Sequence, residues 1–464
     1  MRRILLAAHP TIGHISALRA IGVQLRDRGH TVGFATTRVR LPISGLWPAP
    51  LQAGMEVESA IRSHGLEVLP LSPSPGAIWY AARLPWNTGH DELAVAIELF
   101  TVGLGNQARE IAAWASRMDA DVIVGDYLMP AAMLAAGLVR RPYVALYHSA
   151  LPFPVDGAAP FGSGLGTTDR GSPAWIAAEA ALRRLERRFD DRVQRAADAL
   201  GLSRPAAQLL TRPLSPDLNL LATSPQLEPG LQPLDGPVQM IGPCLPSLRA
   251  GGAPSHPSLD VLPPDGLRVY VSLGTVMNGK PRIYDQILDG LAILGASVVV
   301  SAGTSLRRLS VRRRARTWLY DRVPQVALLP QVDLVVTHGG QNTVQECLAL
   351  GKPMLVVPFG GDQIENAARV ERLGVGEALN PNQLDRELIR DAAARVVAKS
   401  HLRSRALATS LGGADGARDG AAAILEFLME RERRRAAVEE AIRKGDTLDD
   451  VYGEPPPPPP EFSI

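Results

Sequence analysis

Residues able to bind a phosphorylated sugar gather in one stretch of the second half of the chain, Asp333–Asn366. It reads DLVVTHGGQNTVQECLALGKPMLVVPFGGDQIEN, which predicts an apolar strand, a glycine-bearing loop and a helix from Asn342 to Leu350. Unpaired N–H groups and the positive dipole end at a helix N-terminus attract anions, and glycines let a phosphate approach the backbone closely. We expect Asn342 to cap the helix and Gln345 to complete a capping-box-like pair. The pattern predicts a phosphate-binding loop.

Polar side chains around this loop suggest how the rest of such a ligand would be held. Thr343 and Glu346 are three positions apart, so a helix presents both on one face. Thr343 can donate a hydrogen bond to a phosphate oxygen, and Glu346 can accept hydrogen bonds from ribose hydroxyls. His338 can add a hydrogen bond to a diphosphate. Asp362 and Gln363 follow the next predicted strand and supply a carboxylate and an amide for sugar hydroxyls.

A second reactive side chain, His14, follows the first predicted strand. Arg3–Ala8 reads as a largely apolar strand, the segment from Ile15 to Arg28 has helical spacing, and Thr31–Thr36 reads as a second strand. This βαβ opening predicts a parallel sheet, whose carboxyl-end loops line the binding crevice. Imidazole is a practical base for removing a hydroxyl proton near neutral pH. The structural alternative is a helix-capping histidine. The loop lacks GxGxxG, so it is not a dinucleotide fingerprint.

These motifs resemble those of a known family. The order THGGQNTVQE, then GKPMLVVPFGGDQIENA, resembles the donor-binding signature of nucleotide-sugar-dependent glycosyltransferases of the UDP-glycosyltransferase superfamily. It is most similar to bacterial macrolide, antibiotic and carotenoid members. TIGHISAL resembles the loop that holds the catalytic base in this family, and ADVIVGDYLMPAAMLAA resembles the segment that holds its aspartate partner. The resemblance covers residues 1–38 and roughly 267–376, and it is loose over residues 40–260.

The resemblance implies roles for particular residues. His14 would be the general base, and Asp126 would fix its tautomer and stabilise the imidazolium. A strand-end residue that caps a helix is the alternative for Asp126. Because VYVSLGT resembles the first donor-domain strand and loop, Thr275 would bond the diphosphate. The donor-binding set would comprise Gly274, Thr275, Arg322, Gln325, His338, Gly340, Asn342, Thr343, Glu346, Asp362 and Gln363.

One position departs from the family pattern. The Pro324-Gln325 pair marks the turn that binds the nucleotide base, and plant relatives place a stacking tryptophan where Arg322 stands here. A guanidinium can also stack on a base. Both UDP and dTDP donors therefore stay open.

The fold implied by the resemblance is α/β: the GT-B fold, with two Rossmann-like domains whose parallel sheets face each other across a cleft. We expect an acceptor-binding domain at 1–222, a linker at 223–265 and a nucleotide-sugar-binding domain at 266–412. A C-terminal helix at 413–444 should pack back on the first domain, and residues 445–464 form a disordered proline-rich tail. Leu218–Ala222 reads as the last strand of the first domain.

The implied activity is inverting transfer of a sugar from a UDP- or dTDP-sugar to a hydroxyl of a hydrophobic small molecule. This is a hexosyltransferase activity typical of antibiotic and other secondary-metabolite biosynthesis. Trp86, Phe153 and Phe161 lie in proline- and glycine-rich segments and are expected to face the acceptor. No cofactor or metal is expected beyond the nucleotide-sugar co-substrate, because the helix terminus replaces the metal and the donor site has no DxD-type motif.

Two alternatives stay open. One is transfer to a membrane-associated carotenoid or glycolipid, and the other is a non-catalytic, glycosyltransferase-like helper protein. The sequence names neither the sugar nor the acceptor, and it leaves the oligomeric state open.

Composition sets the class of protein. The chain has 464 residues and is 46% hydrophobic and 21% charged. Its net charge of +2 is too small to indicate nucleic-acid binding. Two cysteines fit a reducing compartment. The apolar run near the N-terminus is too short for a signal peptide, and no stretch reaches the roughly 18 apolar residues that span a bilayer. We therefore expect a cytoplasmic protein. The arginine-rich run at 175–200 is interleaved with acids and predicts a solvated face, with a weak membrane-surface contact as the alternative.

Overall fold

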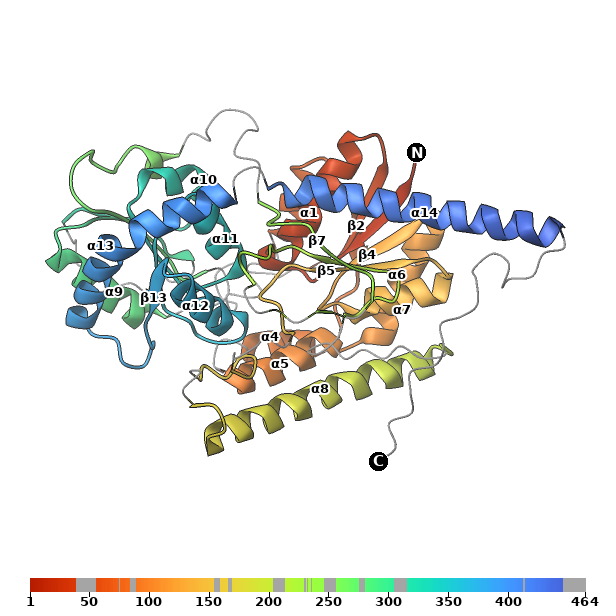
Figure 1. Ribbon diagram of the computed structural model, residues 1–464, viewed down its shortest axis with the longest axis horizontal. Coiled ribbons are helices and arrows are strands. Elements are labelled where there is room, and N and C mark those ends of the chain that lie inside the picture. Colours follow the sequence, from red (N-terminus) through yellow and green to blue (C-terminus); the bar gives the residue numbers. More distant parts are fainter. Residues whose placement is uncertain are drawn as a thin grey trace.

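The structure of the protein is a computed structural model in which two parallel sheets, each flanked by helices, lie side by side (Figure 1). This is the expected α/β architecture of two Rossmann-like domains. The structure describes residues 1–38, 56–74, 76–83, 89–153, 159–165, 169–202, 213–228, 231, 233–234, 236–245, 256–274, 280–303, 315–411 and 414–444.

The first domain is built on a parallel sheet of order β3-β2-β1-β4-β5-β6-β7. Its strands are β1 (Arg3–Ala7), β2 (Thr31–Thr37), β3 (Glu67–Leu71), β4 (Val122–Asp126), β5 (Tyr143–Tyr147), β6 (Leu218–Leu221) and β7 (Val238–Met240). β1 pairs with β2 on one side and with β4 on the other, so the strand order reverses between β1 and β4. In such sheets, ligands bind at the carboxyl ends of the strands beside this reversal.

Helices cover both faces of the first sheet. They are α1 (Ile12–Asp27), α3 (Val57–Arg62), α4 (Ala77–Arg83), α5 (Gly89–Thr101), α6 (Leu104–Arg117), α7 (Pro130–Val139) and α8 (Pro173–Ala199). Side chains alternate along β1: Leu5 joins the core under α6 and α7, whereas Leu6 joins the core under α1. This burial on both faces explains why the strands read as continuous apolar runs.

The second domain repeats the architecture, with strand order β10-β9-β8-β11-β12-β13. The strands are β8 (Arg268–Ser272), β9 (Ser297–Ser301), β10 (Thr317–Tyr320), β11 (Leu334–Thr337), β12 (Met354–Val356) and β13 (Gly376–Ala378). The helices are α9 (Pro281–Ile293), α10 (Gln325–Leu328), α11 (Gln341–Ala349), α12 (Asp362–Arg372) and α13 (Arg386–Ser410), with 3₁₀ turns η3 (Pro257–Leu259) and η5 (Leu329–Gln331). Here the order reverses between β8 and β11.

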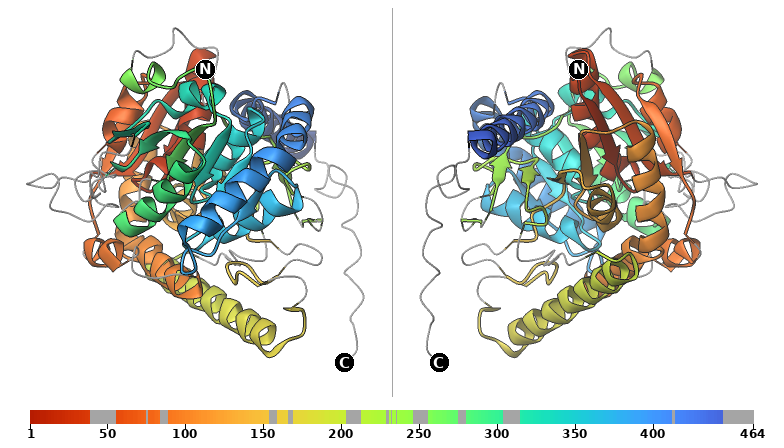
Figure 2. Two further views of the ribbon diagram at one scale, coloured as in Figure 1. Left: turned by 90° about the vertical axis from the view of Figure 1, so that its left-hand side faces the viewer. Right: turned by 90° about the vertical axis from the view of Figure 1, so that its right-hand side faces the viewer.

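The last helix, α14 (Gly416–Lys444), returns to the first domain as expected (Figure 1). Its Ile424 and Leu428 share a core with Ile21 and Leu25 of α1. Figure 2 shows that α14 and the arginine-rich helix α8 lie on opposite sides of the molecule. None of the described helices is long and apolar enough to cross a membrane.

Two expected boundaries are wrong. The first sheet does not finish at Leu218–Ala222, because β7 at Val238–Met240 adds another strand inside the segment expected as a linker. A strand of three residues in a proline-rich segment is too short to show an alternating pattern. The first helix begins at Ile12 rather than Ile15, so His14 lies in its first turn instead of in the preceding loop.

Buried polar contacts join the two domains. The Arg369 guanidinium in α12 lies 2.7 Å from a carboxylate oxygen of Glu228, and both side chains are almost fully buried. The Glu228 carboxylate also accepts a hydrogen bond from Thr223 at 2.9 Å. Gln345 of α11 donates to the carbonyl of Ala222 at 2.7 Å. These contacts fix how the second domain meets the end of β6.

Breaking this buried ion pair should destabilise the protein. Glu228→Gln keeps an acceptor for Thr223 but leaves the buried Arg369 charge without its counter-ion, so we expect a loss of about 3 kcal/mol in the free energy of unfolding. Urea denaturation at pH 7 measures it. Glu432→Gln is the matched control, because Glu432 pairs with Arg2 at an exposed site. Equal shifts for the two variants would contradict the prediction.

Candidate active site

The first part of the site is a histidine–aspartate pair at the carboxyl edge of the first sheet. Asp126 is the last residue of β4, and its side chain is completely buried. His14 lies in the first turn of α1, which follows the adjacent strand β1. His14 Nδ1 lies 2.5 Å from Asp126 Oδ2, and 16% of the histidine side chain stays exposed. The structure thus brings together the two residues expected to pair.

A second histidine shares the same carboxylate. His148, directly after β5, places Nε2 3.0 Å from Asp126 Oδ1, and the backbone N–H of Leu128 donates to the same oxygen at 2.9 Å. Burial opposes ionisation of Asp126, but the two histidines together hold its pKa well below the usual value. Because an ionised carboxylate only accepts hydrogen bonds, the tautomers assigned on this basis have a proton on His14 Nδ1 and on His148 Nε2.

His148 was not predicted from the sequence. Its position could have indicated a role: His148 is a polar residue directly after a buried strand, and Asp126 likewise ends the neighbouring buried strand. Its proximity to Asp126 depends on the parallel pairing of β4 with β5.

Aromatic rings enclose His14. The ring centroids of Phe100 and His9 lie 5.3 Å and 5.9 Å from that of His14. His9 bonds the carbonyl of Leu128 through Nε2 at 3.0 Å. Burial lowers the pKa of His9 to about 4, which makes it a neutral packing residue at pH 7.

The donor loop of the second domain has the expected strand–loop–helix form but a different cap. α11 begins at Gln341, and Gly340 is its N-cap with an extended backbone and no side-chain capping bond. The expectation that Asn342 caps the helix is therefore wrong, because Asn342 is the second helical residue. Since glycine adopts the N-cap conformation readily, the helix starts earlier than the capping-box pattern indicates. Gly340 has no side chain that could cap the first-turn N–H groups, which suits an anion site.

Two glycines make room for the His338 ring. A Cβ atom at Gly274 would lie 2.5 Å from His338 Nε2, and one at Gly340 would lie 2.6 Å from it. Burial lowers the pKa of His338 to about 4. At neutral pH His338 can therefore offer a hydrogen bond but carries no positive charge.

Gln325 connects the residues expected to hold the nucleoside. Its Oε1 accepts from the hydroxyl of Tyr270 at 3.0 Å, and its Nε2 lies 3.1 Å from Thr343 Oγ1 and 2.6 Å from Glu346 Oε2. Burial raises the pKa of Glu346 to about 7, against the opposing effect of Gln325. The structure thus places Gln325, Thr343 and Glu346 in one polar cluster.

The residues expected to hold the sugar lie at the start of α12. Asp362 is its first residue, and Gln363 Oε1 accepts from the backbone N–H of Phe359 at 2.9 Å. Asn366 ties this helix to the donor loop by donating to the carbonyl of Gly339 at 2.9 Å. Burial raises the pKa of Asp362, while His148 and His14 act against that rise through their charges. Asp362 therefore lies within electrostatic range of the histidines of the first domain.

Some expected site residues have other partners. Arg322 forms an ion pair with Glu56 of the first domain, so its guanidinium serves the domain boundary. Phe153 is 4% exposed and packs against Tyr147, which makes it a core residue and not an acceptor-facing one. Phe161 is partly exposed, and its carbonyl is bonded to His90 at 3.0 Å. Thr275 and Trp86 lie outside the described residues.

Among the residues that the structure describes, one group of side chains could bind a cation. Within the described residues, single ligand atoms of His14, Asp126 and His148 all lie within 4.8 Å of one another. Imidazole nitrogens and a carboxylate suit a transition-metal ion.

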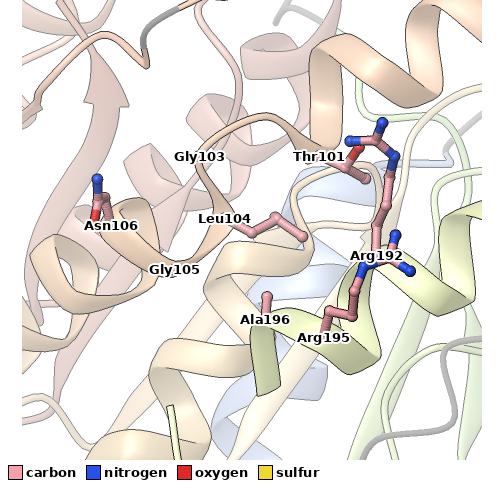
Figure 3. A pocket seen from close by; sticks show the side chains of 8 residues that line it. All are labelled: Thr101, Gly103, Leu104, Gly105, Asn106, Arg192, Arg195 and Ala196. Carbon is pink, nitrogen blue, oxygen red and sulfur yellow. The ribbon is translucent and has the colours of Figure 1, made fainter. Parts of the chain in front are cut away.

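A separate pocket of about 290 Å³ lies between α8 and the turn joining α5 to α6, and its lining includes Thr101, Asn106, Arg192 and Arg195 (Figure 3). None of the predicted site residues that the structure describes lines it.

Comparison with known proteins supports the family assignment. Residues 265–415 match the family described as UDP-glucoronosyl and UDP-glucosyl transferase. Over most of its length the chain is similar to 4'-demethylrebeccamycin synthase of Lentzea aerocolonigenes, at 27% identity over 87% of this chain and 94% of that protein. It is also similar to zeaxanthin glucosyltransferase of Pseudescherichia vulneris, at 25% identity over 82% and 86%. The match to YojK of Bacillus subtilis is 28% identical but spans 35% of this chain and 41% of that protein.

Solved structures agree on the fold. The glycotransferase of kitacinnamycin has a TM-score of 0.66 at 20% identity and covers 92% of this chain and 98% of its own. The glycosyltransferase VinC, solved with dTDP, has a TM-score of 0.63 at 17% identity and covers 92% and 100%.

The two parallel sheets and the likeness to these solved structures show the GT-B architecture. Residues 265–415, which contain the donor loop, match the UDP-glycosyltransferase family, and the relatives that align over most of the chain are glycosyltransferases, so the resemblance predicted from the motifs is confirmed. It is accordingly an enzyme that transfers glycosyl groups.

Neutral, buried His338 should make the protein acid-sensitive. Its pKa is lowered from 6.5 to about 4. Between these two pH values the unfolded chain is protonated at His338 while the folded chain is not, so stability falls as the pH drops from about 6.5 to about 4. Urea denaturation at pH 7 and at pH 5 measures the free energy of unfolding. Between these two pH values, His338→Asn should lose about 2 kcal/mol less of this free energy than the wild type loses. His401→Asn, at an exposed position on α13, is the control. If His338→Asn loses as much unfolding free energy between pH 7 and pH 5 as the wild type, then His338 is not the source of the acid sensitivity.

Proposed function

We propose that the protein transfers a sugar, with inversion, from a UDP- or dTDP-sugar to a hydroxyl of a hydrophobic small molecule, and that His14 is the general base. One observation carries the proposal: the His14–Asp126 pair of the first domain lies within electrostatic range of Asp362 at the donor site of the second. A base and a sugar-holding carboxylate on opposite sides of a domain boundary would flank a reacting hydroxyl.

The chemistry follows from the geometry on each side. With a proton on Nδ1 held by Asp126, His14 has its Nε2 lone pair free to take the acceptor proton, and Asp126 stabilises the imidazolium that forms. The acceptor oxygen attacks the anomeric carbon from the face opposite the diphosphate, which inverts the configuration. The nucleoside diphosphate then leaves with the bonding electron pair.

The donor domain would stabilise the departing diphosphate. The uncapped first turn of α11 supplies N–H groups and its dipole, and His338 and Thr343 supply neutral hydrogen bonds. Asn342 and Thr275 are expected to add to this set. Glu346 would accept from the ribose, while Asp362 and Gln363 would hold the sugar. In this scheme no metal is needed for the leaving group.

The acceptor class is supported by the relatives' names. The chain resembles two zeaxanthin glucosyltransferases, 4'-demethylrebeccamycin synthase and, over a shorter span, the oleandomycin glycosyltransferase of Streptomyces antibioticus. We therefore place its acceptor among hydrophobic hydroxylated natural products. A membrane-associated carotenoid is the second candidate, which the two zeaxanthin enzymes favour. If turnover requires detergent or membranes, the membrane-associated carotenoid is favoured over the other acceptors. The helper-protein alternative is disfavoured because His14, Glu346, Asp362 and Gln363 are all present.

Removing the proposed base should slow the reaction. His14→Ala should lower turnover about 10²–10⁴-fold, because a positioned general base contributes that much, while leaving donor binding intact. Turnover is measured with UDP-glucose and dTDP-glucose against zeaxanthin and the oleandomycin and rebeccamycin aglycones. Donor binding is measured as the rise in melting temperature with UDP or dTDP. His401→Ala is the control. Full activity in His14→Ala would overturn the mechanism, and the absence of any nucleotide-induced shift would favour the helper protein.

Removing divalent metal ions should leave the reaction unaffected. Because the α11 terminus and neutral side chains are proposed to meet the diphosphate charge, dialysis against EDTA should leave turnover within twofold of its starting value. Loss of turnover on chelation, with recovery on adding a divalent cation, would show that the diphosphate or the His14–Asp126–His148 group requires a metal.

A further inference from the structure

One peptide group of the first domain is held by both domains at once. It joins Phe161 to Gly162. His90 Nε2, near the start of α5, lies 3.0 Å from the Phe161 carbonyl oxygen, and because a carbonyl only accepts, this ring nitrogen is assigned a proton. The Gly162 N–H donates to Glu365 Oε1 in α12 of the second domain at 2.8 Å. The carbonyl and the N–H of a single peptide group are thus bound to opposite sides of the domain boundary.

We propose that Glu365 is a positioning residue, which together with His90 holds residues 159–165 beside the sugar-binding end of α12 and so fixes Phe161 on the acceptor side of the site. The interdomain clamp consists of the Phe161–Gly162 peptide group and its two partners, His90 and Glu365. Its consequence for the acceptor rests on the proposed function, because that function places the sugar at α12 and the acceptor in the first domain.

The chain around Gly162 is shaped to present its N–H. The Ser163 N–H donates to the Pro160 carbonyl at 3.0 Å, which closes a four-residue turn. Gly162 is the third residue of this turn and has a φ of +73°, at the position where a type II turn requires a positive φ. The turn uses the N–H of Ser163, so the N–H of Gly162 stays available for Glu365. A Cβ atom at Gly162 would lie 3.7 Å from the His90 ring, so the ring packs directly against the turn.

The interdomain clamp lies within one helical turn of the expected sugar-binding residues. Asp362 begins α12, and Glu365 follows it by three positions, so both lie on one face of the first turn. A Cβ atom at Gly164 would lie 3.6 Å from the Ile364 side chain, so a second residue of the segment also packs against α12. Residues 161–164 therefore lie beside the end of α12 at which the sugar is proposed to bind.

The interdomain clamp also links two helices that border the proposed reaction site. α5 carries His90 near its start and Phe100 near its end, and the Phe100 ring centroid lies 5.3 Å from that of His14. α12 begins at the residues expected to hold the sugar. The segment at 159–165 thus reaches from the helix beside the proposed base to the helix beside the proposed sugar. Phe161 is partly exposed within this segment, where it can border the acceptor.

The test removes each partner of the peptide group in turn. Glu365→Ala removes the acceptor of the Gly162 N–H, whereas Glu365→Gln keeps a side-chain oxygen that can accept it. His90→Ala removes the bond to the peptide carbonyl from the other domain, and it tests the same peptide group if Glu365→Ala does not fold. Glu371→Ala is the matched control, because its carboxylate, at an exposed position of the same helix, also accepts a hydrogen bond from a backbone N–H.

Amide hydrogen exchange measures the interdomain clamp without donor or acceptor, by mass spectrometry on peptides that cover residues 159–165 of the full-length protein. Exchange in these peptides should become several-fold faster in Glu365→Ala, because the Gly162 N–H loses its acceptor, and in His90→Ala, because the turn that presents this N–H loses its support. Glu365→Gln and Glu371→Ala should stay close to the wild type. Wild-type exchange in Glu365→Ala would overturn the proposal.

Steady-state kinetics measure the consequence for the acceptor, with whichever of zeaxanthin and the oleandomycin and rebeccamycin aglycones the wild type glycosylates. The acceptor KM should rise about three- to tenfold in Glu365→Ala and in His90→Ala, the range that one hydrogen bond supplies, while kcat and the donor KM change by about twofold or less. In the double variant the acceptor KM should rise no further, because both residues hold one peptide group. Glu365→Gln should restore most of the wild-type value.

The two readouts separate this proposal from the proposed function. Faster exchange with an unchanged acceptor KM would overturn the proposal, because the interdomain clamp would then have no effect on the acceptor. If exchange responds as expected but neither UDP nor dTDP raises the melting temperature of the wild type, the interdomain clamp joins the domains and the proposed function has failed.

Discussion

A single buried carboxylate between two imidazoles is the interaction on which the rest of the site depends. Asp126 is fully buried yet stays ionised because His14, His148 and the Leu128 N–H all donate to it. An isolated charge at this depth would be too costly to keep, so each donor helps to maintain the ionised form. The three side chains come from the ends of neighbouring parallel strands and the helix after β1, and any slip in strand register would separate them.

The second constraint is the contact between domains. The Glu228–Arg369 ion pair is linked through Asn366 to the carbonyl of Gly339 in the donor loop. The same helix begins with Asp362, whose pKa the histidines of the first domain lower through their charges against the rise from burial. Buried polar groups must be paired, so this network favours one relative placement of donor loop and base over alternatives that leave a charge unpaired. Domain packing and site geometry are therefore determined by the same residues.

The donor loop shows how backbone shape supports chemistry. Gly274 and Gly340 leave space for the His338 ring, and Gly339 has a φ of +88° that favours glycine. The enclosed ring is neutral, while Glu346 has a pKa near neutrality. The donor site thus offers hydrogen-bond donors and a helix terminus to a diphosphate more than it offers fixed positive charge.

The sequence by itself determined the fold class and the identity of most candidate residues. Apolar strands alternating with helical segments indicate parallel α/β domains, and HGGQNT and GGDQ follow buried strands at positions set by local chain geometry. It did not determine β7, whose three residues show no pattern, nor the start of α11, where Gly340 and not Asn342 forms the cap.

Only the tertiary structure decided which of these residues meet. His148 is 134 positions from His14 in sequence, and strand order alone brings both to Asp126. The same applies to Arg322, which pairs with Glu56, and to Phe153, which is buried against Tyr147. Periodicity and motifs report how each segment folds locally, whereas contacts between distant segments depend on sheet order and domain packing, which no local pattern records.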